Sequence, residues 1–83
     1  MSVTALTLKI ISPEGTLFSG VVSTVKLPGV MGTFTVLPQH APIISVLNKG
    51  VVVYEVQGET KEQPVQSGFV EVINNEVTVC VEI

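Results

Sequence analysis

The feature that most constrains this chain is a repeated alternation of apolar and polar residues with a period of two. Leu6, Leu8 and Ile10 fall on one face of an extended chain, and Thr7 and Lys9 fall on the other. No window shows apolar residues at helical spacing over three turns. Val, Ile and Thr are abundant, and β-branched residues favour strands. The sequence therefore predicts an all-β fold.

The predicted strands are short and recur at a spacing of roughly ten residues. They cover residues 6–10, 16–19, 21–27, 33–37, 43–47, 51–56, 61–66, 69–73 and 76–81. Hairpins are expected around Gln57-Gly58-Glu59 and Asn74-Asn75, because Gly and Asn tolerate the positive φ of tight turns. Eight or more such strands indicate a sandwich or barrel of two packed sheets. No linker or repeat divides the chain, so residues 1–83 are expected to form one domain.

Composition excludes several classes of function. Apolar residues make up 46% of the chain and charged residues 13%, which favours compact folding over disorder. A net charge of −3 with only four basic residues disfavours nucleic acid and anionic lipid as ligands. No apolar run approaches the roughly 18 residues that span a bilayer, and the N-terminus lacks a signal-peptide pattern. We therefore expect no direct membrane insertion, with the chain in the cytosol or on the cytosolic side of a membrane.

Few residues offer catalytic or metal chemistry. The chain has no Asp, Arg or Trp, one histidine (His40) and one cysteine (Cys80), which lies in an alternating run typical of a strand. This removes multi-histidine metal sites and arginine clamps on phosphate. The glycines match neither a phosphate-binding loop nor a dinucleotide turn. His40 lies between Pro38 and Pro42, which stiffen the loop, so we expect a solvated loop residue or a binding contact rather than a general base. No catalytic, metal or cofactor site is predicted.

The residues alone leave two classes of binding or carrier protein to consider. Lys49 before Gly50 would suit a cofactor carrier that presents a lysine at a hairpin tip, although a lone lysine is more often a plain surface residue. A sugar-binding β module is disfavoured, because such proteins stack aromatic rings on sugars and this chain has only Tyr54 and three Phe.

The sequence resembles the epsilon subunit of rotary F-type ATP synthases over essentially its whole length. The resemblance is carried by LPGVMGTFTVLPQHAP at 27–42, with Leu47 and Gly50 after it. Flanking blocks follow in the family's order: ISPEG at 11–15, FSG at 18–20, SGFVEV at 67–72, Asn75, and VTV at 77–79.

The resemblance implies a flattened sandwich of about ten short strands in two sheets. It also implies a non-catalytic subunit of the central stalk, which binds the gamma subunit and the c-ring so that the two turn together. Such a subunit lies peripherally on the cytoplasmic face of the bacterial inner membrane. The family's ring-facing loops correspond to Met31, Gly32, Thr33, Gln39 and His40, and its gamma-facing positions to Ile43, Ile44 and Ser45.

This sequence departs from the family pattern in two respects. Many relatives carry Glu at the positions of Met31 or Thr33 and Gly at that of Gln39, so ring contact here is expected to be apolar or hydrogen-bonded. Many also continue into a helical hairpin that regulates the motor and in some cases binds ATP. The 83 residues contain no such hairpin, so we expect them to couple rotation without hairpin inhibition and without binding nucleotide.

Overall fold

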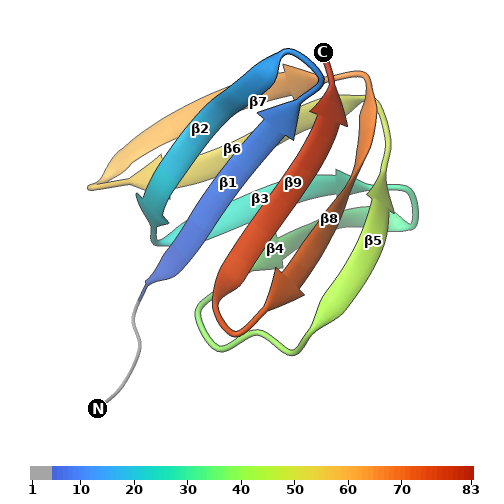
Figure 1. The fold of residues 1–83 in the computed structure, drawn as a ribbon. Helices are drawn as coiled ribbons and strands as arrows, with labels where there is room; N and C mark the ends of the chain where they lie inside the picture. The colour runs from blue at the N-terminus through green and yellow to red at the C-terminus, as the bar shows by residue number, and fades with distance from the viewer. Residues whose placement is uncertain (1–4) are drawn as a thin grey trace.

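The computed structural model describes residues 5–83, and every regular element in them is a strand (Figure 1). The predicted all-β class is confirmed, with nine strands where the resemblance implied about ten. The strands are β1 (Leu6–Ser12), β2 (Gly15–Val22), β3 (Thr24–Gly29), β4 (Gly32–Val36), β5 (Ile43–Leu47), β6 (Gly50–Val56), β7 (Glu59–Val65), β8 (Ser67–Ile73) and β9 (Glu76–Glu82).

The strands form two layers that face each other. Strands β2, β1, β9, β8 and β5 make the front layer in Figure 1, and β7, β6, β3 and β4 make the back layer. The layers join at one corner, where Gly29 of β3 pairs with Leu47 of β5. The hydrogen-bonded sheet is therefore continuous and folds over on itself into a sandwich. Neighbours are antiparallel except β1 and β9, which are parallel, so the first and last strands lie side by side.

The core lies between the layers and is almost entirely aliphatic. Alternate residues of each strand point inward, as in β1, whose even-numbered residues are buried and whose odd-numbered residues are exposed or half-buried. Half-buried Phe18 packs on Tyr54 with ring centroids 4.6 Å apart, which links β2 to β6. The buried apolar residues are Leu6, Leu8, Ile10, Val22, Val25, Leu27, Val36, Leu47, Val52, Tyr54, Val65, Val70, Val72, Val77, Val79 and Val81.

Two hairpin turns follow the prediction from sequence. Gln57 and Gly58 have φ values of 50° and 82°, and Asn74 and Asn75 have 50° and 62°. Positive φ at both central residues matches the right-handed twist of the flanking strands. These turns fix the registers of β6 with β7 and of β8 with β9.

The predicted single strand over residues 21–27 is wrong. β2 continues to Val22 and β3 begins at Thr24, so Ser23 separates two strands in different layers. The inward-facing positions change phase there: Val22 and Val25 are buried, whereas Val21 is 63% exposed. Ser23 is held at the crossing because its amide donates to the Glu55 carbonyl (3.0 Å) and its hydroxyl to the Glu55 carboxylate (2.7 Å).

Candidate functional site

The titratable side chains of the described chain are the first candidates for a site, and they do not gather into a metal-binding group. Within residues 5–83, no group of three or more His, Cys, Asp or Glu side chains is placed to hold a metal ion. The same residues contain no helix able to cross a membrane. His40 lies with Nδ1 2.7 Å from the Ala41 carbonyl oxygen, a local contact that orients the ring. Lys49 is exposed between β5 and β6, which do not pair with each other, so it does not occupy the hairpin tip that a carrier lysine requires.

A cluster of exposed apolar side chains lies on the outer surface of β5 and β8. Ile44 is 74% exposed, Val46 58%, Phe69 50% and Ile73 45%. Val46 lies directly opposite Phe69 in the antiparallel pair, so these side chains are neighbours on one surface. We call these four residues the β5–β8 face. Contiguous apolar surface of this kind marks interaction sites, whereas single exposed apolar residues are common.

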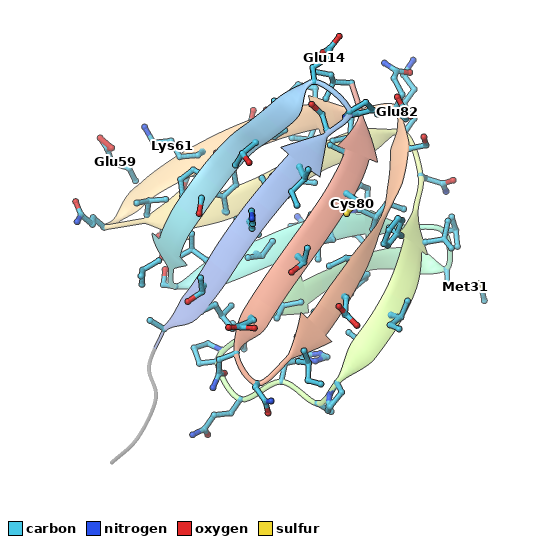
Figure 2. All side chains as sticks on the ribbon, viewed as in Figure 1. Glu14, Met31, Glu59, Lys61, Cys80 and Glu82 are labelled. Atoms are coloured by element: carbon cyan, nitrogen blue, oxygen red, sulfur yellow. The ribbon has the colours of Figure 1, made fainter. Side chains whose placement is uncertain are left out.

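The turn between β3 and β4 extends the β5–β8 face at one end. The Val30 amide donates to the Val46 carbonyl at 3.0 Å, which holds the turn against β5. Met31 is 95% exposed and projects away from the body of the protein (Figure 2). Gly29 permits this tight hairpin, because a Cβ there would lie 2.7 Å from the Gly32 carbonyl oxygen.

The loop from β4 to β5 lies at the other end of the face and is tied to the β8–β9 turn. The Gln39 amide donates to the Asn75 side-chain oxygen at 2.5 Å. The Asn75 carbonyl in turn accepts from the Thr7 amide at 2.9 Å, so this residue links β1, the β8–β9 turn and the loop. Gln39 has a φ of 67°, and the His40 amide donates to the Leu37 carbonyl at 3.2 Å. These bonds support the predicted rigid loop.

The predicted ring-facing residues form two groups rather than one. Met31, Gly32 and Thr33 lie where β4 begins, and Gln39 and His40 lie in the loop that follows its end. Because β5 returns along the molecule toward Gly29, the two groups mark opposite ends of the β5–β8 face.

The predicted gamma-facing residues lie on β5 between these groups, but their side chains differ in exposure. Ile44 is fully presented, whereas Ile43 and Ser45 are half-buried. Sequence reasoning missed Val46, Phe69 and Ile73. The sequence did hold a signal for these exposed apolar residues. Residues 43–47 and 69–73 are almost continuously apolar, so a strand in either range has apolar side chains on both faces.

A shallow pocket opens at the end of β5 and β8. Its volume is about 360 Å³, and it is lined by Pro42, Ile43, Ile44, Glu71, Val72 and Ile73. Two of these residues, Ile44 and Ile73, belong to the β5–β8 face, so the pocket is a hollow in the same surface. Glu71 is the one charged residue among those that line it.

Residues 5–83 thus form a β-sandwich that presents exposed apolar side chains between two ordered loops, a kind of surface typical of interaction sites. Residues 5–83 match the family model described as the beta-sandwich domain of the ATP synthase Delta/Epsilon chain. The chain belongs to this family.

Similar proteins agree with the family assignment. The chain is 42% identical over 73 residues to the ATP synthase epsilon chain of Desulfitobacterium hafniense, covering 88% of this chain and 55% of the relative. It is 44% identical over 78 residues to the epsilon chain of a Nitratiruptor species, covering 93% and 60%. The chain thus spans little more than half the length of these relatives.

Two solved structures share the fold. A chain in the cryo-EM structure of the Euglena gracilis mitochondrial ATP synthase (OSCP/F1/c-ring) superposes with a TM-score of 0.90 at 17% identity, covering 98% of this chain and 52% of that one. A chain of the Tetrahymena thermophila mitochondrial ATP synthase central stalk and c-ring gives 0.80 at 12% identity, covering 100% and 67%. At these identities the similarity establishes the fold alone.

Proposed function

We propose that this chain is a central-stalk subunit of a proton-translocating F-type ATP synthase, with residues 1–83 acting as one domain. It binds the gamma subunit and the c-ring, couples their rotation to ATP synthesis, and carries no catalytic site. Its place is peripheral, at the cytoplasmic face of a bacterial inner membrane. Membership of the Delta/Epsilon family supports this role, as do structural relatives in ATP synthase assemblies described as OSCP/F1/c-ring and as central stalk and c-ring.

The β5–β8 face is the observation on which the proposal depends. Ile44, Val46 and Phe69 are each exposed by half or more, so this apolar surface meets water unless a partner covers it. The inner side of the same strands packs against the aliphatic core, so the face sits on a closely packed body. Such a body transmits torque because packed interiors resist deformation.

The proposed contacts lie on β5 and in the loops at the two ends of this face. We assign Met31, Gly32 and Thr33, together with Gln39 and His40, to the c-ring, and the stretch Ile43, Ile44 and Ser45 to gamma. Since the two ring-facing groups lie at opposite ends of β4, simultaneous contact with both requires a ring surface that extends along the strand.

Cysteine crosslinking in the assembled synthase tests the assignment. Met31→Cys and His40→Cys are made in a Cys80→Ser background and paired with a cysteine in the polar loop of the c subunit. Gln57→Cys is the control, because it lies at an exposed turn between β6 and β7 in the other layer. We expect crosslinks from Met31→Cys or His40→Cys and none from Gln57→Cys. Co-purification of the assembly without a crosslink from either position would refute the ring contacts, and failure to co-purify with gamma would refute the stalk role.

A further inference from the structure

Among residues 5–83, Glu71 is the charged residue that lies between members of the β5–β8 face, while Glu76 of β9 lies opposite Ile73 at its edge. It lies on β8 between Phe69 and Ile73, which point to the same side of the strand, and its direct neighbour across the antiparallel pair is Ile44 of β5. Glu71 is also one of the residues that line the pocket described above. Glu71 therefore places one negative charge inside otherwise apolar surface.

No positive group in the described part of the chain balances this charge. On the other side of β8, Glu71 lies opposite Thr78 of β9, and Lys9 of β1 lies opposite Thr78 in turn. Lys9 is thus two strands away from Glu71, at about 10 Å from strand spacing alone. Within residues 5–83 the structure contains one ion pair, Lys61 with Glu59 at 3.5 Å, and it lies on β7 in the other layer.

An uncompensated carboxylate limits what can cover this face. Burying an ionised carboxylate without a partner costs far more than the burial of one neighbouring side chain returns. A purely apolar partner surface would leave the Glu71 carboxylate buried without a positive partner. The covering surface must therefore bring a cation to Glu71, and apolar groups to Ile44 and Ile73.

Lysine and arginine side chains combine both properties. Their methylene stems pack on apolar surface while the charged head remains free to pair. A pocket of about 360 Å³ with Ile44, Ile73 and Pro42 among its walls and Glu71 beside them suits such a side chain. Arginine adds a planar fork that binds a carboxylate through two hydrogen bonds.

We propose that the pocket beside Glu71 receives a lysine or arginine side chain from the protein that covers the β5–β8 face. The stem packs between Ile44 and Ile73, and the head pairs with Glu71. This inference rests on the proposed function, because the partner is taken to be the rotor subunit that this chain binds. The pairing of a basic side chain with Glu71 would then contribute to the selection of that partner.

Charge variants in the full chain test the pairing. The affinity of tagged wild-type protein for the gamma subunit of the same synthase is measured by interferometry and compared with Glu71→Gln, Glu71→Lys and the matched controls Glu62→Gln and Glu62→Lys. Glu62 is an exposed strand carboxylate on β7, in the layer away from the face. We expect Glu71→Gln to weaken binding about tenfold and Glu71→Lys more, with the controls changed by less than about twofold.

Glu71→Gln retains the shape of the side chain and keeps the test valid if Glu71→Lys disturbs the fold. Each lysine and arginine on gamma is then changed to glutamate, and recovery of binding by Glu71→Lys with one of these variants identifies the partner residue. Binding by wild type with no difference between the Glu71 and Glu62 variants overturns the pairing and leaves the stalk role intact. Absence of wild-type binding to gamma overturns both.

Discussion

Asn75 is expected to hold the β4–β5 loop through a single side-chain hydrogen bond. The contribution of this bond to stability can be separated from the contribution of the Asn75 backbone conformation. Its Oδ1 accepts from the Gln39 amide, and its φ is 62°. The adjacent Asn74 has a φ of 50°, but its side chain makes no hydrogen bond to any of residues 5–83, so it is a matched control. The test set is Asn75→Gly, Asn75→Ala, Asn74→Gly and Asn74→Ala.

The expected magnitudes follow from these two contributions. Glycine adopts positive φ without strain, so Asn75→Gly removes only the hydrogen bond to Gln39. Because that bond is solvent-exposed, its loss should cost about 0.5–1 kcal/mol. Alanine adds the left-handed backbone cost of about 1–2 kcal/mol, so Asn75→Ala should lose about 1.5–3 kcal/mol in total. Asn74→Gly should be close to neutral, and Asn74→Ala should lose the backbone cost alone.

Two measurements check this reasoning. Urea unfolding gives the free energies, and about 1 kcal/mol corresponds to a shift in Tm of about 4–8 °C for a domain of this size. Amide hydrogen exchange by NMR reports on Gln39 directly, and its protection should fall in both Asn75 variants but in neither Asn74 variant. Equal stability losses for Asn75→Gly and Asn74→Gly, together with an unchanged Gln39 exchange rate, would refute a structural role for this bond.

Two other predictions concern packing and ligand binding. Gly68→Ala should destabilise the domain by about 2–3 kcal/mol, because a Cβ would overlap the Cys80 carbonyl oxygen and crowd Val81. Thermal unfolding compares this variant with the control Gly20→Ala, whose Cβ would meet only the Phe18 ring at 3.2 Å. Equal losses of stability in the two variants would contradict the prediction. Residues 1–83 should show no saturable ATP binding by titration calorimetry. The described residues expose an apolar face and scattered carboxylates and form no phosphate-binding loop. A measurable binding isotherm would contradict this prediction.

Much of the fold was predictable because local alternation determines which residues face the core. Local sequence was enough to predict one strand and two hairpin turns, and all three are present: the strand over 6–10 and the turns at Gln57-Gly58 and Asn74-Asn75. The strand break at Ser23 was not predictable. An alternating pattern continued through it, and the bonds that stop β2 there come from Glu55, which is 32 residues away.

The candidate site was only partly predictable for a related physical reason. The sequence suggests exposed loops at 31–33 and 39–40, and both are presented at the surface. It does not reveal that Phe69 and Val46 are neighbours, because that contact depends on the pairing of β5 with β8 across the intervening hairpin. The isolation of Glu71 likewise becomes visible only once the cross-strand neighbours are known.

The parallel pairing of β1 with β9 affects how the domain can form during translation. Leu8 acquires its neighbour Val77 only when almost all of the domain has left the ribosome. Until then one edge of β1 is an open template for another chain. Long-range pairing of this kind slows folding, so nascent copies should complete the front layer only when β9 docks on β1.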